Sequence, residues 1–252
     1  MPTDTLHPKA VLPLLRTSFG RPYRYTNRCE STQDLLDPDA PEGALAVAEE
    51  QTAGRGRRGR AWSAPAGEAI LCSVMLRPPP TRLAAQTSLL GGLAAARALS
   101  DASSCAVRIK WPNDVLVGRR KVAGVLAEAS DGHVVLGFGL NINQAVDSFP
   151  VDLRESAGSL RTLDGRSRTR APILAGLLAA LQDVYGVWSE HGFAAVTAEL
   201  AELDALRGLE VQVGSVGGTA AGLDDDGRLL VTREGRCVAI DAGEVSVPSV
   251  GW

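Results

Sequence analysis

The segment from Gln51 to Trp62 carries residue types that could bind an anion. It places four arginines beside three glycines, with no acidic residue among them, and ends in a tryptophan. Glycine lets the backbone approach a ligand closely and turn its N–H groups toward it. Arginine adds a permanently charged, forked donor that matches phosphate and carboxylate oxygens. From composition alone, a flexible nucleic-acid tether and a solvated surface loop remain as alternatives.

A second group of polar residues interrupts an apolar run at Lys110-Trp-Pro-Asn-Asp114. Proline cannot donate to a sheet ladder, so the interruption predicts a bulge, a bend or a strand end. A purely structural turn does not require a lysine, an amide and a carboxylate within five residues. Lys121 begins the next alternating segment, where a lysine alone could equally serve to protect an edge strand.

A third group lies at Glu30-Ser-Thr-Gln-Asp-Leu-Leu36, which has the pattern of a helix start. Ser31, with Asp34 three residues later, resembles a capping box. Capping is the simpler interpretation of Ser31 and Thr32. A helix N-terminus with spare hydroxyl groups can nevertheless also bind a polar ligand group.

The composition is that of a folded protein that can bury a core. The chain has 252 residues, 45% hydrophobic and 22% charged, with a net charge of −3, so no overall charge draws it to nucleic acid or to an anionic membrane. The four cysteines form no pattern typical of a metal site, and we expect Cys72 and Cys237 to be reduced and buried. The first 20 residues lack a secretory pattern, and no apolar stretch approaches the length of a membrane span, which predicts a cytoplasmic protein.

Hydrophobic periodicity predicts strands alternating with helices over the first two hundred residues. The expected strands lie at residues 23–25, 45–49, 70–76 (half-buried), 107–117 (as a pair), 121–128 and 133–143. Helices are expected at 83–99, with Thr81 as its cap, at 173–188 after Pro172, and at 193–206. We interpret 144–171 as irregular, with Arg166, Arg168 and Arg170 in a solvated loop.

After Gly208 the period changes from that of helices to that of strands. Asp226-Gly227 and Glu234-Gly235 are hairpin signals between short apolar runs, enough for a small barrel. We therefore divide the chain into an N-terminal extension (1–22), a large central domain (23–206) and a C-terminal domain (207–252). The extension can offer one short helix at most, too little for a helix-turn-helix domain.

Taken in order, these motifs resemble the biotin protein ligase family from about Tyr25 to the C-terminus. The resemblance rests on Glu30-Ser-Thr32, the glycine-arginine segment, Lys110-Trp-Pro-Asn-Asp114, Arg120-Lys-Val-Ala-Gly124 with Glu128, Gly137-x-Gly-x-Asn141 and Gly243-Glu-Val-Ser246. It implies an α+β fold like that of class II aminoacyl-tRNA synthetases, with a mixed sheet, flanking helices and a C-terminal SH3-like β-barrel. It also implies a short form without the DNA-binding domain that some members carry.

The resemblance implies a two-step reaction. Biotin and MgATP give biotinyl-5′-AMP and pyrophosphate, and a lysine of a biotin carboxyl carrier protein domain, of acetyl-CoA carboxylase or another biotin-dependent carboxylase, then attacks the mixed anhydride. ATP and Mg²⁺ are implied, without a metal site made by the protein itself. No nucleic acid or membrane partner is expected, and the sequence leaves open whether the chain forms a homodimer.

The resemblance also assigns roles to residues. The expected biotin-binding residues are Ser31, Thr32, Gln33, Gln51, Gly54, Arg55, Gly56, Arg57, Lys121 and Gly124. The expected nucleotide-binding residues are Arg57, Arg58, Arg60, Trp62, Asn113, Lys121 and Asn141. The expected catalytic residues are Lys121, Arg57, Lys110 and Asp114. Gln33 departs from the family, which often has asparagine there.

Two alternatives remain from the sequence. A lipoate or octanoate protein ligase shares the fold and the acyl-adenylate chemistry but binds a long apolar acyl chain. A nucleic-acid-binding module would instead use the arginine segment and the terminal barrel, and the net negative charge argues against it.

Overall fold

A seven-stranded mixed sheet organises the first two thirds of the chain. The computed structural model describes residues 4–248. Across the sheet the strands are β1 (Tyr23–Cys29), β2 (Leu45–Gln51), β5 (Ala69–Leu76), β9 (His133–Asn141), β8 (Arg120–Ser130), β7 (Asp114–Val117) and β6 (Val107–Lys110). β1 pairs with β2 in parallel, and the other pairings are antiparallel. The strand predictions are thus confirmed, including the strand pair around Lys110 and Asp114.

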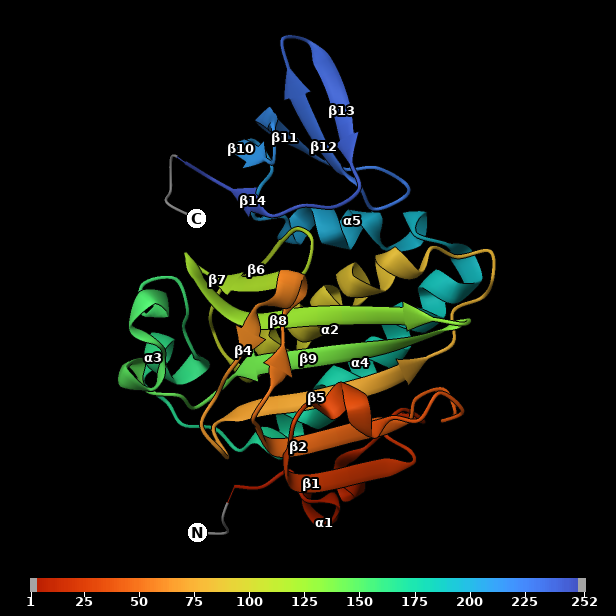
Figure 1. Ribbon diagram of the computed structural model, residues 1–252, viewed down its shortest axis with the longest axis vertical. Helices are drawn as coiled ribbons and strands as arrows, with labels where there is room; N and C mark the ends of the chain where they lie inside the picture. The colour runs from red at the N-terminus through yellow and green to blue at the C-terminus, as the bar shows by residue number, and fades with distance from the viewer. Residues whose placement is uncertain (1–3, 249–252) are drawn as a thin grey trace.

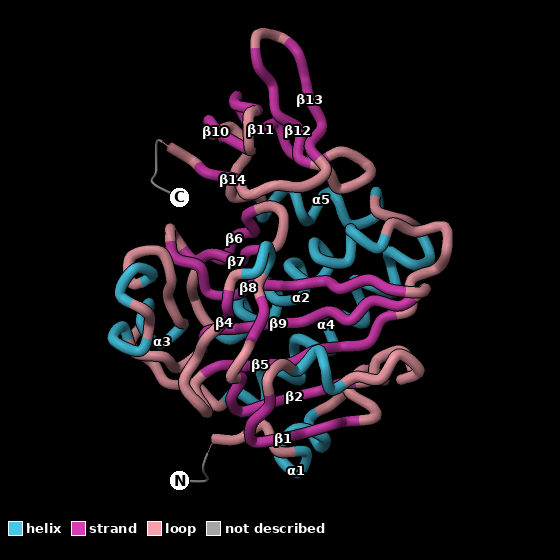
Figure 2. The backbone as a smooth tube through the Cα atoms, in the orientation of Figure 1, coloured by secondary structure: helices cyan, strands magenta, loops and turns pink. Residues whose placement is uncertain are grey.

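Two helices, α2 (Thr87–Ala102) and α4 (Arg170–His191), pack on one face of this sheet and are seen behind it in Figure 1. The short α1 (Pro8–Val11) packs on α4, α5 (Ala194–Leu203) contacts α4, β6 and the C-terminal strands, and α3 (Leu160–Asp164) lies beyond one end of the large sheet. We call the opposite face of the sheet, on which the predicted site residues lie, the ligand face. The main apolar core lies between α2, α4 and the sheet. The opposite face carries a 3-10 turn and the small hairpin formed by β3 (Gly54–Arg55) and β4 (Ala61–Trp62), seen in front of β8 and β9 in Figure 2.

Strand β5 is buried on both faces, not half-buried as its alternation predicted. Its even-numbered residues join the main core, and there Cys72 is buried as predicted, which raises the pKa of its thiol. On the other face, Ser73 meets the Thr32 hydroxyl at 2.8 Å. This second face of β5 is covered by the 3-10 turn Thr32–Leu35 and by Trp62 of the hairpin. The alternation of residues within the strand does not predict such distant contacts.

Helix α2 begins at Thr87, so the predicted start near residue 83, with Thr81 as its cap, is wrong. The chain first makes a 3-10 turn over Ala84–Gln86. Gln86 is buried there: its Oε1 accepts from Trp188 Nε1 at 2.7 Å and its Nε2 donates to the Asp225 carbonyl at 3.3 Å. These long-range bonds hold the residue at the junction of α2, α4 and the C-terminal sheet.

The last part of the chain forms a five-stranded antiparallel sheet in the order β13, β12, β11, β10, β14. Its strands are β10 (Glu210–Val213), β11 (Val216–Leu223), β12 (Leu229–Arg233), β13 (Arg236–Ile240) and β14 (Val245–Ser246). The predicted Glu234-Gly235 turn is present, with both residues at positive φ. Cys237 is exposed on the edge strand β13, so its predicted burial is wrong.

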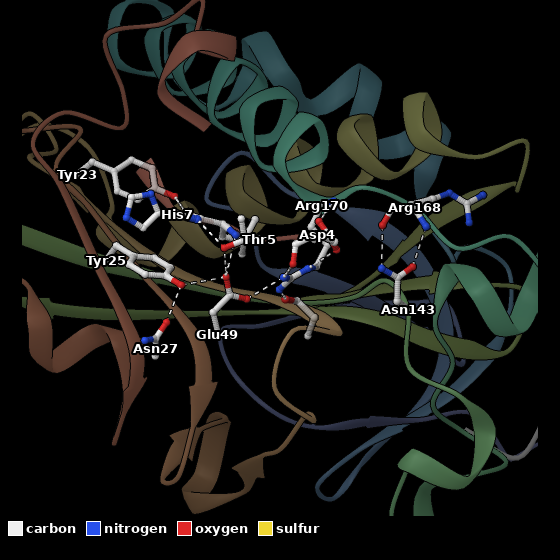
Figure 3. A network of polar contacts seen from close by, with 12 residues as sticks. Asp4, Thr5, His7, Tyr23, Tyr25, Asn27, Glu49, Asn143, Arg168 and Arg170 are labelled. Atoms are coloured by element: carbon white, nitrogen blue, oxygen red, sulfur yellow. Dashed lines mark hydrogen bonds and ion pairs between the residues drawn. The ribbon is translucent and has the colours of Figure 1, made fainter. Parts of the chain in front are cut away.

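The interpretation of Arg168 and Arg170 as solvated is wrong, whereas Arg166 is exposed as expected. The Arg170 side chain is fully buried at the start of α4 and forms ion pairs with Asp4 at 2.8 Å and Glu49 at 2.7 Å (Figure 3). Arg168 pairs with Asp164. The partners Asp4 and Glu49 lie more than 100 residues away, so the local sequence gave no sign of burial.

Arg170 ties together elements that reach the ligand face. Its Nη1 donates to the Ala69 carbonyl, at the first residue of β5, at 2.8 Å. Glu49 lies two residues before Gln51 on β2. Burial raises the pKa of the Glu49 carboxyl, but the hydrogen bond from the Leu6 N–H and the contact with Arg170 outweigh it. The pKa of Glu49 is therefore lowered. The network therefore fixes the ends of two neighbouring strands.

Helix α4 is the one helix in the described part of the chain that meets the length and composition of a membrane span. Over half of its most apolar window, 56%, is buried inside the protein. It is therefore the core helix of this fold.

Replacing Arg170 should strongly destabilise the fold, because Asp4 and Glu49 would lose their partner in a buried site. Arg170→Ala should lower the free energy of unfolding by about 3–5 kcal/mol. The exposed Arg166→Ala is the matched control and should change it by less than about 0.5 kcal/mol. Urea denaturation measures both, and equal effects would contradict the role of Arg170.

Candidate functional site

A cavity of about 550 Å³ opens on the ligand face of the large sheet. Its walls come from the 3-10 turn Thr32–Leu35, the hairpin, strands β7 to β9, the segment 149–157 and the loop 243–245 of the C-terminal sheet. Every residue predicted for binding or catalysis lines it except Gly54. Those that do are Ser31, Thr32, Gln33, Gln51, Arg55, Gly56, Arg57, Arg58, Arg60, Trp62, Lys110, Asn113, Asp114, Lys121, Gly124 and Asn141.

Gly54 does not line the cavity, but its lack of a side chain lets two lining residues, Gln51 and Trp62, keep their positions. A Cβ at this position would lie 2.4 Å from the Trp62 carbonyl oxygen and 2.7 Å from Gln51 Nε2. Only glycine therefore lets β3 pair with β4 while Gln51 keeps its place.

One end of the cavity is lined by a set of hydroxyl and amide groups. Gln51 Oε1 accepts from the Thr32 backbone N–H at 2.7 Å and from its hydroxyl at 2.9 Å. Ser31 caps the 3-10 turn by accepting from the Gln33 N–H at 3.3 Å. The capping prediction for Ser31 is confirmed, but the capping box is not formed, since the Asp34 carboxylate instead binds Arg55. Ser31 and Thr32 are nearly fully buried.

Gln33 is anchored to the sheet. Its amide donates to the carbonyls of Leu126 at 3.1 Å and Val135 at 3.4 Å. A Cβ at Gly137 would lie 2.9 Å from the Gln33 amide nitrogen, so glycine makes room for this side chain. Gln33 thus positions the turn that carries Ser31 and Thr32.

Trp62 lies on a floor made of glycine. Gly124 and Gly139 are directly paired on β8 and β9. A Cβ at Gly139 would lie 2.2 Å from Trp62 Cε2, and one at Gly124 would lie 2.9 Å from Cζ3. Lys121 Nζ stands 5.5 Å from the centroid of the Trp62 ring, within the range of a cation–π contact.

Cationic side chains gather around Asp114 at the middle of the cavity. Lys121 Nζ lies 2.6 Å from Asp114 Oδ1. Burial lowers the pKa of Lys110, while the charges of Asp114 and Glu244 oppose that change. Burial also lowers the pKa of Arg57, and an arginine stays charged regardless. The site thus concentrates positive charge, with Asp114 and Glu244 as counter-ions.

The C-terminal sheet completes the cavity. Arg57 Nη1 donates to the Gly243 carbonyl at 3.4 Å, and Arg60 forms an ion pair with Glu244 that lowers the pKa of that carboxylate. The C-terminal sheet also contacts the Lys110–Asp114 turn, where Trp111 Nε1 donates to the Gly227 carbonyl at 3.0 Å. The hairpin and the Lys110–Asp114 turn are therefore both held by the C-terminal sheet.

Two asparagines tie neighbouring strands together at the cavity wall. Asn113 Nδ2 donates to the Val125 carbonyl at 2.8 Å. Asn141 accepts from Gln144 Nε2 at 2.7 Å and donates to the Lys121 carbonyl at 3.5 Å. These bonds fix the backbone of β8 at Lys121 and at Val125.

Comparisons with known proteins agree with this architecture. Residues 24–143 match the model of the biotin/lipoate A/B protein ligase family, and residues 210–247 match that of the biotin protein ligase C terminal domain. The bifunctional ligase/repressor BirA of Bacillus subtilis is 35% identical over 233 residues, covering 86% of this chain and 71% of that protein. The biotin–[acetyl-CoA-carboxylase] ligase of Mycobacterium tuberculosis is 36% identical over 214 residues, covering 81% and 79%.

A solved structure agrees as well. The biotin protein ligase of Aquifex aeolicus, in complex with biotin and ATP, superposes with a TM-score of 0.81 at 30% identity, covering 88% of this chain and 96% of that one. The chain belongs to the biotin protein ligase family. The expected fold, a mixed sheet with flanking helices and a C-terminal SH3-like domain, is confirmed.

Sequence reasoning missed part of the cavity wall of this family member. The segment 149–157 lines the cavity through Ala157 and through residues that we interpreted only as irregular: Phe149, Pro150, Asp152, Leu153 and Ser156. The exposed Arg119 and the floor residue Gly139 were also absent from the predicted site. The Phe149-Pro150 pair in a polar region was the available signal.

Residues 4–248 contain no group of three or more histidine, cysteine or acidic side chains arranged to hold a metal. Asp114 nevertheless suits Mg²⁺, which typically binds one or two carboxylates together with substrate phosphates. Mg²⁺ bound to a nucleotide would supply charge neutralisation there.

Filling the glycine floor should displace Trp62 and weaken ligand binding. Gly139→Ala puts a methyl group where the Trp62 ring lies, and overpacking of about 1–3 kcal/mol predicts at least about fivefold weaker binding of biotin. Gly176→Ala, in α4 with open space around it, should leave binding unchanged. Titration calorimetry checks both, and unchanged affinity in Gly139→Ala would refute the packing role of the floor.

Proposed function

We propose that this chain makes biotinyl-5′-AMP from biotin and MgATP and then transfers biotin to a specific lysine of a biotin carboxyl carrier protein domain. The observation that carries the proposal is one cavity with a buried hydroxyl and amide end beside a cluster of cations. Biotin has a polar ureido ring, an apolar bicycle and a carboxylate, so it needs both ends. The chain is accordingly a ligase that forms a C–N bond.

Biotin would be held at the hydroxyl and amide end. Ser31, Thr32 and Gln51 would bind the ureido ring, and Trp62 with the glycine floor would contact the apolar bicycle. The backbone of Arg55 to Arg57 would cover the acyl chain. The carboxylate would then point toward Lys121.

In the first step a biotin carboxylate oxygen attacks the α-phosphorus and the bond to pyrophosphate breaks. Both reactants are anions, so their approach and the charge that develops on the phosphoryl oxygens need fixed cations. Lys121, Arg57, Arg60 and Lys110 would supply them. Lys121 would leave Asp114 and bridge the biotin carboxylate and the phosphate.

In the second step the amine of the carrier lysine attacks the acyl carbon, AMP leaves, and an amide forms. Asp114 would orient this amine once Lys121 has turned to the phosphate. Asn113, Asn141 and Arg58 would orient the nucleotide, and closure of the arginine hairpin would exclude water from the mixed anhydride.

The proposal includes the cellular context. The acceptor would be the carrier domain of acetyl-CoA carboxylase or another biotin-dependent carboxylase, in the cytoplasm, without nucleic acid as a partner. The chain would comprise an N-terminal extension (1–22), a catalytic domain that binds biotin and ATP (23–206) and a C-terminal SH3-like domain (207–252). Each chain carries this cavity, so a homodimer would have one such site in each protomer.

A transfer assay tests the function directly. The chain is mixed with biotin, MgATP and a carrier domain, and mass spectrometry locates the added biotin. We expect modification of the carrier's single acceptor lysine and none when that lysine is arginine. Transfer of lipoate or octanoate instead would assign the chain to the alternative ligase activity.

Removing the Lys121 charge should slow adenylate formation. Lys121→Met keeps the length of the side chain, and loss of one such group predicts a rate lower by about 10²–10³-fold. Pyrophosphate release without acceptor measures this step, with Lys9→Met, exposed and far from the cavity, as the control. Equal rates for the two variants would exclude a catalytic role for Lys121.

Shortening Arg57 should release the intermediate. Arg57→Gly removes the side chain that spans from the hairpin to the Gly243 carbonyl, so biotinyl-5′-AMP should escape and label lysines of bystander proteins. The exposed Arg166→Gly serves as control. Blotting for biotin in a protein mixture provides the measurement, and labelling confined to the carrier would overturn the assignment.

A further inference from the structure

The Arg55 side chain makes two bidentate contacts at once. Its Nη1 and Nη2 donate to Asp34 at 2.9 and 2.8 Å, and its Nε and Nη2 donate to Glu128 at 3.1 Å each. Bidentate pairs fix the orientation of both partners as well as their distance. One guanidinium therefore holds two carboxylates from different parts of the chain.

The two carboxylates belong to the elements that build the biotin end of the cavity. Asp34 lies in the turn that carries Thr32 and Gln33, and Glu128 lies on β8, the strand of Lys121. Arg55 itself is in β3, at the base of the hairpin 54–62. Its side chain thus joins the hairpin to both the turn and the strand beneath it.

The other contacts of the hairpin lie on β4 and at its tip. Trp62 packs on the glycine floor, and Arg57 and Arg60 bind the 243–244 loop. β3 and β4 share only two residue pairs, and Arg58 to Ala61 are exposed, so the Arg55 side chain is what ties β3 to the turn and to β8. The ion-paired side chains are 38% (Arg55), 50% (Asp34) and 44% (Glu128) exposed, so solvent screens them and their contribution to global stability is small. Small local energies still decide how often a short exposed segment opens.

We propose that Arg55 is a positioning residue that latches the hairpin 54–62 closed over the part of the cavity that would hold the biotin acyl chain. Asp34 and Glu128 are its two anchors. The proposal rests on the proposed function for its effect on the adenylate. The latch touches no reacting atom. It sets how long the hairpin stays closed, and hence how slowly the ligand beneath it leaves.

The chain supplies a matched control. Arg97 on α2 also binds two carboxylates, Glu199 at 2.7 and 2.5 Å and Asp183 at 2.6 Å, and its side chain is 34% exposed. These residues join α2, α4 and α5 behind the sheet. Neither Arg97 nor its partners line the cavity, so the double variant D183N/E199Q removes an equivalent pair without touching the hairpin.

The first test uses limited proteolysis of the protein without ligand. D34N/E128Q keeps all the arginines of the hairpin, so trypsin meets the same cleavage sites. We expect cleavage between Arg55 and Arg60 to be faster by about fivefold than in the wild type, the size expected for lost exposed ion pairs. D183N/E199Q should be cleaved there at the wild-type rate. Equal hairpin cleavage in D34N/E128Q and D183N/E199Q overturns the latch.

The second test measures release of biotinyl-5′-AMP after a single turnover. D34N/E128Q should release it about fivefold faster than the wild type, and D183N/E199Q at the wild-type rate. Added salt should speed release from the wild type and narrow the difference. Formation of adenylate with equal release from all three proteins overturns the latch alone. A wild type that forms no adenylate overturns the proposed function, and the proteolysis result still decides the latch.

Discussion

The constraint on which the site depends is the repulsion between two anions that must meet. A carboxylate and a phosphate approach each other only where fixed cations offset their charge, and such cations are most effective away from water. Burying Lys110 and Arg57 lowers the pKa of each, and the Asp114 carboxylate stands among them as counter-ion. The remaining structure holds these charged side chains in place around the cavity.

Placement begins with a sheet that has one covered and one open face. Glycines on β8 and β9 leave room for the Trp62 ring on the ligand face, and the buried Arg170 fixes the ends of β2 and β5. The C-terminal sheet touches the Lys110–Asp114 turn through Gly227 and the arginine hairpin through Gly243. The C-terminal sheet therefore holds both of these segments of the cavity wall.

The sequence predicted what local pattern and motif can express: the strands, the long helix α4, and the residues around the cavity. It failed where partners are distant. The residues around Arg170 do not indicate its partners Asp4 and Glu49, so we predicted a solvated side chain where the structure has a buried one. The residues around Asp34 do not indicate Arg55, so we predicted a capping role where the structure has an ion pair. The burial of β5 on both faces likewise depends on the hairpin that folds back over it.

The most direct test of the account is pyrophosphate release in MgATP without any acceptor, compared for biotin, lipoate and octanoate. A cavity with buried hydroxyl and amide groups at one end and cations in the middle should support release with biotin and none with the two ureido-free acids. Release with lipoate or octanoate, or none with biotin, would contradict it.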